Sequence, residues 1–175
     1  MNYYYLIASL PGVDLDAPPP LPPDEFRSIC GEHLSRSDFD ALTALLDNSN
    51  PDRENSFVRE WREFDSALRN TIARVRAGKL NMDPSEHTRQ DIGYDPSVEK
   101  AVSAAFSIDN PLEREKSIDR LRWERLNELA GFDPFAARAL LAYTLKLLLA
   151  KRWSDLNRDK GADRSENIIN RDPED

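Results

Sequence analysis

The sequence has almost no cysteine and no long hydrophobic run, and each shortage excludes a class of protein. Cys30 is the only cysteine in the 175 residues, so the chain cannot form an internal disulfide. This usage fits a reducing compartment, and we expect a cytoplasmic protein. The longest uninterrupted apolar run, residues 3–8, has only six residues, and the apolar stretch at 139–150 is interrupted by Thr144 and Lys146. A membrane-spanning helix needs about 20 apolar residues, so we expect no direct insertion into a membrane.

Basic residues are also under-represented. The chain carries 24 lysine and arginine residues against 32 acidic residues, which gives a net charge of −8. Nucleic-acid backbones and anionic lipid surfaces attract basic faces, so this charge argues against both as partners. An acidic chain can still carry a local basic stripe. The first residues, MNYYYLIASLP, lack the basic segment that begins a signal peptide, so we expect no signal peptide.

Glycine is scarce, with six residues, and valine is rare beside leucine and alanine. This composition favours helix over sheet. With 39% hydrophobic residues, a chain of this length can bury one core. We therefore predict an all-α multi-helix bundle. Residues 1–156 form its single domain, with a proline-rich connector at 11–23, and a charged, largely disordered tail follows at 157–175.

Apolar residues repeat at helical spacing along much of the chain. The longest pattern runs in steps of three and four from Phe57 to Val75 and predicts a helix that ends at Gly78. Asp95, which precedes a proline, predicts the start of a shorter helix.

Two further helices are predicted nearer the start, over residues 24–34 and after a cap at Ser35 or Ser37. Residues 3–10 are apolar on every side, and we interpret them as a short buried helix. Residues 79–95 contain proline and glycine and predict an irregular connection.

Residues 110–156 predict a long C-terminal antiparallel helical hairpin. Asn110 and Asp133 each precede a proline, the signature of an N-cap followed by the first helical position. Gly131 supplies a left-handed end to the first helix. Because so few residues join the two helices, the helices must lie antiparallel.

Two arginines in the hairpin, Arg122 and Arg125, project within the apolar face of the first helix. Arginine is almost never buried without a partner, so each requires a carboxylate, an aromatic face or another protein. We favour an internal ion pair, for example with an acid of residues 54–78. Contact with a partner protein is the alternative.

A second group of arginines, Arg62, Arg69 and Arg76, follows at intervals of seven residues along the Phe57–Val75 pattern. This spacing nearly aligns the three side chains on one side of a helix. We interpret them as a solvated edge whose aliphatic stems cover the core. A strip that meets an acidic partner is the alternative.

Residues that could support catalysis or hold a metal do not cluster in the sequence. A zinc site needs three or four ligands at defined spacings, and Cys30 with His33 is more typical of a core cysteine beside a half-buried histidine. An enzyme would require a cleft that gathers His33, His87 and Asp95. No glycine-rich phosphate loop occurs. We expect a protein that is not an enzyme and that has no cofactor and no metal.

Motifs spread over almost the whole chain resemble an uncharacterised bacterial family. They are YYLIASLP at 4–11, the segment from Trp61 through LRN at 68–70 to RAGKL at 76–80, RW at 122–123, and YTLKL at 143–147 followed by RW at 152–153 and Gly161. The family consists of small helical proteins encoded among the subunits of V/A-type ATPases.

The last motif is also similar to helices of the C/d-type stalk subunit of these ATPases. In that subunit a tyrosine is followed three residues later by a lysine, then by a glutamate, and a glycine lies beyond the helix. Tyr143, Lys146 and Gly161 match this pattern, whereas Leu148 and Leu149 stand where the glutamate is expected.

The resemblance implies a non-catalytic accessory or stalk-associated subunit of a V/A-type proton- or sodium-translocating ATPase. Its partners would be other ATPase subunits, and it would attach to the inner membrane only peripherally, through the ATPase. A free-standing cytoplasmic adaptor or regulator is the alternative, and the oligomeric state stays open. Six residues are candidates for an interface or a structural lock, namely Arg122, Trp123, Arg125, Tyr143, Lys146 and Trp153.

Overall fold

The computed structural model describes residues 3–80 and 95–169, and the side chains up to residue 158. These residues form seven helices and no strand, so the all-α prediction is confirmed. The helices are α1 (Tyr4–Ser9), α2 (Pro23–His33), α3 (Arg36–Leu46), α4 (Ser56–Leu80), α5 (Pro96–Ala105), α6 (Pro111–Ala130) and α7 (Ala137–Ile169).

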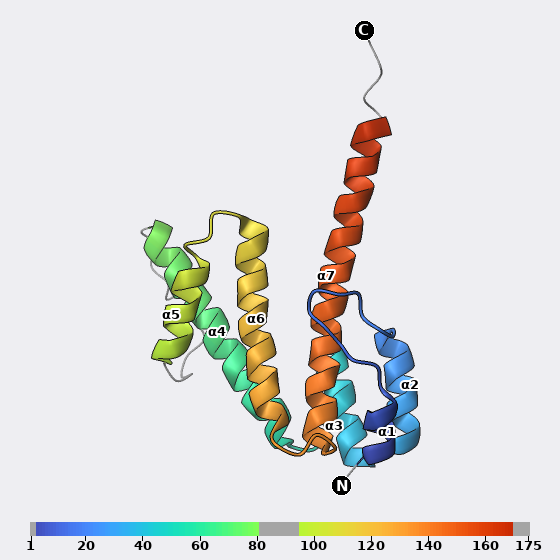
Figure 1. Cartoon of the computed structure of the whole chain (residues 1–175). Coiled ribbons are helices and arrows are strands. Elements are labelled where there is room, and N and C mark those ends of the chain that lie inside the picture. Colours follow the sequence, from blue (N-terminus) through green and yellow to red (C-terminus); the bar gives the residue numbers. More distant parts are fainter. Residues whose placement is uncertain (1–2, 81–94, 170–175) are drawn as a thin grey trace.

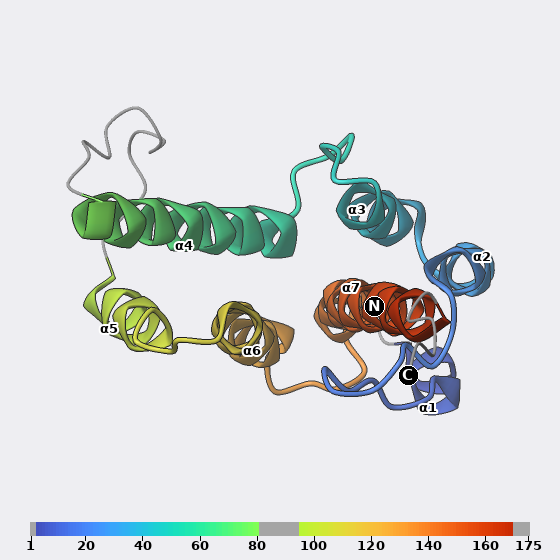
Figure 2. The same ribbon diagram turned by 90° about the horizontal axis from the view of Figure 1, so that it is seen from above.

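Helix α7 lies between two groups of helices (Figure 2). One group consists of α1, α2 and α3, and the other consists of α4, α5 and α6. Helices α6 and α7 run in opposite directions and contact each other closely (Figure 1). Beyond the other helices α7 continues alone to Ile169.

Short polar side chains begin three of the helices at the predicted positions. The Ser35 Oγ accepts a hydrogen bond from the Asp38 N–H at 3.2 Å at the start of α3. Asp95 and Asn110 accept bonds of 2.8 and 3.0 Å from the backbone two residues later, at the starts of α5 and α6. Each cap satisfies a backbone N–H that has no partner within its own helix.

Two predicted helix ends and one predicted helix start are wrong. Helix α4 passes through Gly78, and α7 passes through residue 156 and through Gly161. Glycine inside a helix costs only about 1 kcal/mol relative to alanine, which the hydrogen bonds of the surrounding turns outweigh. Helix α7 begins at Ala137 and not beside Asp133, although the Asp133 carboxylate accepts a bond from the Phe135 N–H. The Phe135 carbonyl accepts from the Tyr3 N–H at 2.8 Å, and the Ala139 N–H bonds to the Ala136 carbonyl, so the turn that follows Asp133 does not continue as an α-helix.

The N-terminal segment is helical as predicted, but it is buried on one side only. Tyr3 and Leu6 face the core, whereas Tyr5 is 88% exposed. A short helix on the surface of a bundle can bury only one of its sides. The predicted irregular segment 79–95 begins with two residues of α4, and its remainder lies almost entirely outside the described residues.

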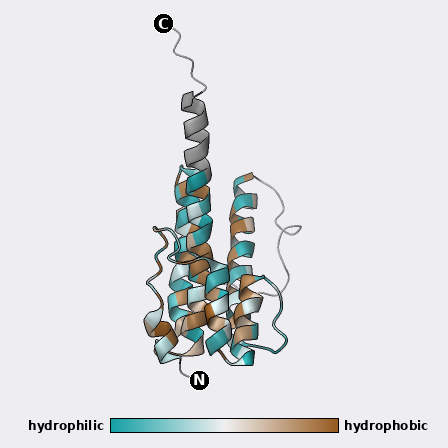
Figure 3. Ribbon diagram, turned by 90° about the vertical axis from the view of Figure 1, so that its right-hand side faces the viewer, coloured by the Kyte–Doolittle hydropathy of each residue, from teal (hydrophilic) through white to brown (hydrophobic). Residues whose placement is uncertain are grey.

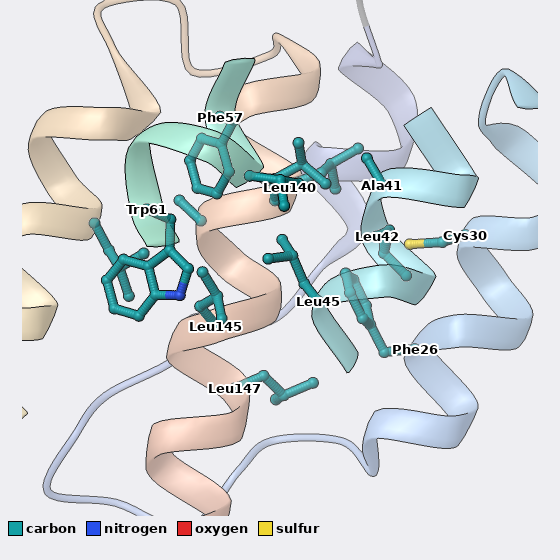
Figure 4. Close-up of a cluster of buried hydrophobic side chains, with 14 of the residues drawn as sticks. Phe26, Cys30, Ala41, Leu42, Leu45, Phe57, Trp61, Leu140, Leu145 and Leu147 are labelled. Atoms are coloured by element: carbon teal, nitrogen blue, oxygen red, sulfur yellow. The ribbon is translucent and has the colours of Figure 1, made fainter. Parts of the chain in front are cut away.

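The main core surrounds the first half of α7. Leu140, Leu145 and Leu147 of α7 meet side chains from α2, α3 and α4 (Figure 4). Hydropathy colouring shows the same concentration of apolar residues where α7 passes between its neighbours (Figure 3). A second cluster joins α4, α5 and α6 through Leu68, Val102, Ala105, Phe106 and Ile118. The described helices include none that is both long and apolar enough to cross a membrane.

Candidate interaction site

The charged centre of the molecule is Asp119 on α6, whose side chain has no exposed surface. Its Oδ1 accepts from Arg122 at 2.7 Å, and its Oδ2 accepts from Arg152 at 2.8 Å and from the Trp153 indole at 2.9 Å. A buried carboxylate is tolerated only with such partners. These bonds connect α6 directly to α7.

Arg122 extends the same network to α4. Its Nε donates to Asp65 Oδ1 at 3.0 Å, and its side chain is only 14% exposed. Burial alone would lower the pKa of Arg122, but the Asp65 and Asp119 carboxylates outweigh burial and raise it. Arg122 is therefore a charged internal connection between α4 and α6. The contacts that join Asp119 to Arg122, Arg152 and Trp153, together with the contact between Arg122 and Asp65, are called the Asp119 network.

A groove lies beside this network, between α4 and α6. It has a volume of about 580 Å³. Its floor is apolar and consists of Ile72, Ala73, Ala77 and Leu80 of α4 with Ile118 of α6. Arg122 of the Asp119 network lies at one edge. We call this feature the α4–α6 groove.

Arginines line the rim of the groove. Arg69 and Arg76 of α4 have side chains that are 65% and 57% exposed. Arg69 pairs with Asp65 at 2.8 Å, and Arg76 pairs with Glu115 at 3.3 Å. Arg152 of α7 also reaches Glu115, at 3.5 Å. Arg62, the third arginine of the predicted stripe, instead binds Asn50 and the Ser49 carbonyl in the turn after α3.

Arg125 lies apart from the Asp119 network, although it is only three residues from Arg122. Its Nη1 donates to Glu128 at 2.8 Å, and its guanidinium lies 5.7 Å from the centre of the Phe64 ring. It lines a second groove of about 500 Å³ between α4, α5 and α6. The lining of that groove combines apolar side chains with five carboxylates, those of Glu60, Glu63, Asp95, Glu124 and Glu128.

The remaining predicted residues pack elsewhere on α6 and α7. The Lys146 Nζ donates to Asn127 at 2.6 Å and lies 5.2 Å from the centre of the Trp123 ring. Burial lowers the pKa of Lys146. The Tyr143 hydroxyl donates to the Pro11 carbonyl at 3.0 Å, and its ring packs on Phe26.

The structure thus brings two predicted residues, Arg122 and Trp153, to one carboxylate that the sequence reasoning missed, together with Arg152, which was not a predicted site residue. Asp119 had a signal that could have identified it. It lies seven residues before Leu126, on the same side of the helix as Arg122. An acid in that position, within a buried face, requires a basic partner.

The residues considered for an enzyme or a metal site do not come together where the structure describes them. His33 is exposed on α2 and so is not half-buried as predicted, while Cys30 is fully buried. Asp95 caps α5, at the opposite end of the molecule from α2 (Figure 2). His87 lies outside the described residues. Among the side chains that are described, no group of three or more histidine, cysteine or acidic residues could hold a metal ion.

In the comparison with known proteins, one family model matches part of the chain. Residues 97–172 match the model of a family described as "Protein of unknown function (DUF2764)". The expectation of an uncharacterised family is confirmed for this region, which includes most of α5 and all of α6 and the described α7. No curated protein matches the chain, and no solved structure matches it.

Proposed function

We propose that this chain is a non-catalytic accessory or stalk-associated subunit of a V/A-type ATPase, and that it binds its partner through the α4–α6 groove. The observation that carries the interaction function is the apolar floor of the groove, which lies open between arginines. Apolar centres surrounded by polar rims are typical of protein interfaces, and arginine is enriched in them.

The Asp119 network supports this function as a scaffold. It connects α4 and α6 through the nearly buried Arg122 and connects α7 through the buried Asp119, so the two helices that line the groove are fixed before a partner arrives. A preformed surface loses less conformational entropy on binding. The link to the ATPase rests on the resemblance of the motifs at 4–11, 61–80 and 143–153.

A free-standing adaptor is the second candidate, since the same groove could serve a partner outside any ATPase. The two functions differ in what the protein binds in the cell. We would therefore tag the full chain and capture it from gently solubilised native membranes and from the cytosol. Recovery of ATPase stalk or head subunits supports the first function. A protein that is recovered from the cytosol without them supports the second.

A pair of matched variants tests whether the groove is responsible. Ala73→Gln places a longer, uncharged side chain on the groove floor, and glutamine is a good helix former. Ala104→Gln makes the same change at an exposed position of α5. We expect Ala73→Gln to lose the captured subunits while Ala104→Gln retains them. Equal capture by both variants, with both proteins folded, contradicts binding through the groove.

A further inference from the structure

We infer that the α4–α6 groove accepts an amphipathic helix whose apolar stripe is flanked by acidic residues. This inference rests on the proposed function, because it names the class of partner that the same groove would bind. It follows from three observations, namely the shape of the floor, the charge of the rim and the absence of a sheet edge among the described residues.

The floor has the spacing that receives a helix. The α4 side chains that line the groove, both floor and rim, run from Arg69 to Leu80 and recur at steps of three and four over about three turns, or about 16 Å at 1.5 Å per residue. In the middle, Ala73 and Ala77 leave room for the side chains of a partner. Ile72 and Leu80 flank that space, and Leu80 is 67% exposed. Apolar residues of a partner helix at the same spacing would fill it.

The rim is basic in an acidic protein. Three arginines and one glutamate line the groove, although the chain carries a net charge of −8. Arg76 also lies 5.7 Å from the centre of the buried Phe106 ring, which Lys79 and Arg114 approach to 5.6 and 5.2 Å. The rim therefore continues through Arg76 to two further cations, Lys79 and Arg114, near the C-terminal end of α4. Arginine forms paired hydrogen bonds with carboxylates, and a basic partner would be repelled.

The form of the partner follows from the secondary structure around the groove. An extended peptide gains affinity by adding a strand to an exposed sheet edge, and the described residues contain no sheet. A helix has its backbone hydrogen bonds satisfied internally and can bind by side chains alone. Packing between α4 and α6 would make it the third helix of a local bundle.

Two synthetic peptides test this inference on the full-length protein without any ATPase. Both are about 15 residues long, the length at which helices begin to form in water. Both carry the same leucine stripe, flanked by glutamate in one and by lysine in the other. By fluorescence anisotropy at low salt we expect the glutamate peptide to bind about tenfold more tightly, as two or three exposed ion pairs allow. Added salt should weaken this binding.

A double variant tests the rim itself. Arg69→Gln with Arg76→Gln removes two exposed rim charges, and Arg36→Gln with Arg59→Gln removes two exposed charges elsewhere. We expect only the first pair to reduce binding of the glutamate peptide. The inference is overturned if the lysine peptide binds equally well or better, if the glutamate peptide shows no saturable binding, or if both double variants behave alike.

These outcomes are separate from the fate of the proposed function. If the wild-type protein captures ATPase subunits and Ala73→Gln does not, but the rim variant captures them fully, the groove is the interface and the acidic class is wrong. If no ATPase subunit is captured and the glutamate peptide binds as expected, the acidic class stands and the assignment to the ATPase fails.

Discussion

The indole N–H of Trp153 on α7 donates to Asp119 Oδ2 on α6 at 2.9 Å, in a place where the Asp119 side chain has no exposed surface. The same oxygen accepts from Arg152 at 2.8 Å. Two adjacent residues of one helix therefore hold a single carboxylate of another. This arrangement makes Asp119 a buried polar connection between α6 and α7.

Replacing Asp119 should destabilise the protein more than replacing any exposed acid. Asp119→Ala leaves the Arg122 Nη1 and the Trp153 N–H without their acceptor, and breaking a buried ion pair costs about 3–5 kcal/mol. We expect a correspondingly lower free energy of unfolding in urea, measured by circular dichroism. Asp155→Asn, which removes an exposed acid paired with Lys151, is the control and should change little. A small effect of Asp119→Ala would show that water replaces the lost carboxylate.

Arg122 and Asp65 should be energetically coupled. Their side chains are 14% and 16% exposed and meet at 3.0 Å, and contacting partners in one network show interaction energies of about 0.5–3 kcal/mol. A double-mutant cycle with Arg122→Met and Asp65→Asn should give a value in this range. The matched control is the same cycle with Arg120→Met in place of Arg122→Met, because the Arg120 side chain is 55% exposed.

A second variant of Arg122 tests whether this residue has an internal role or a role at an interface. Because Arg122 is nearly buried, Arg122→Ala should reduce folding stability and capture of partners together. Additive effects in the cycle, or a loss of capture without a loss of stability, would favour a direct role of Arg122 at the interface.

Two glycines should respond to alanine in opposite directions. Gly131 ends α6 with φ 77° and ψ −168°, a conformation that is almost restricted to glycine, so Gly131→Ala should cost about 1–3 kcal/mol. Gly78 lies inside α4, and an added Cβ there would meet nothing within 4 Å. Gly78→Ala should therefore stabilise the protein by about 0.5–1 kcal/mol. Thermal unfolding of both variants measures the two signs, and a destabilising Gly78→Ala would contradict the helical placement of Gly78.

The thiol of Cys30 should be unreactive in the folded protein. Its side chain is fully buried, and burial raises its pKa to about 12. The thiolate is the reactive form, so the reaction with a thiol reagent at pH 8 should be slow and should accelerate in urea. Ser107→Cys supplies an exposed reference thiol on the same chain. Rapid reaction of the wild-type protein without urea would show that α2 opens readily from the core.

Tyr143 should make the protein sensitive to alkali. Burial, with a smaller effect of Cys30, raises the pKa of Tyr143 from 10.0 to about 12. The folded protein holds this proton more tightly than the unfolded chain. The stabilisation that comes from this raised pKa is therefore fully present below pH 10 and is lost as the pH rises towards 12.

Urea unfolding over this range of pH measures the effect. Tyr143→Phe removes the titrating group and also the hydrogen bond to the Pro11 carbonyl. We expect Tyr143→Phe to be less stable at pH 8 and to lose less stability between pH 10 and 12. Parallel pH profiles for the two proteins would mean that the Tyr143 hydroxyl titrates as it does in solvent.

Local features of the sequence were enough to predict the helical class and several helix starts. Ser35, Asp95 and Asn110 cap helices where predicted, because a cap depends on residues within one turn. Gly131 likewise ends α6 through its own backbone conformation. The ends at Gly78 and residue 156 were wrong because glycine and charged residues weaken a helix only slightly, and the neighbouring turns decide whether it continues.

The candidate site was only half predictable. The sequence by itself determined that Arg122 lies within an apolar face and must have a partner. Only the tertiary structure decided that the partners are Asp119, three residues away, and Asp65, 57 residues away. The α4–α6 groove is also a tertiary feature, since it exists only where two helices distant in sequence approach. Helical periodicity specifies the face of each helix, whereas the pairing of faces depends on how all the helices pack at once.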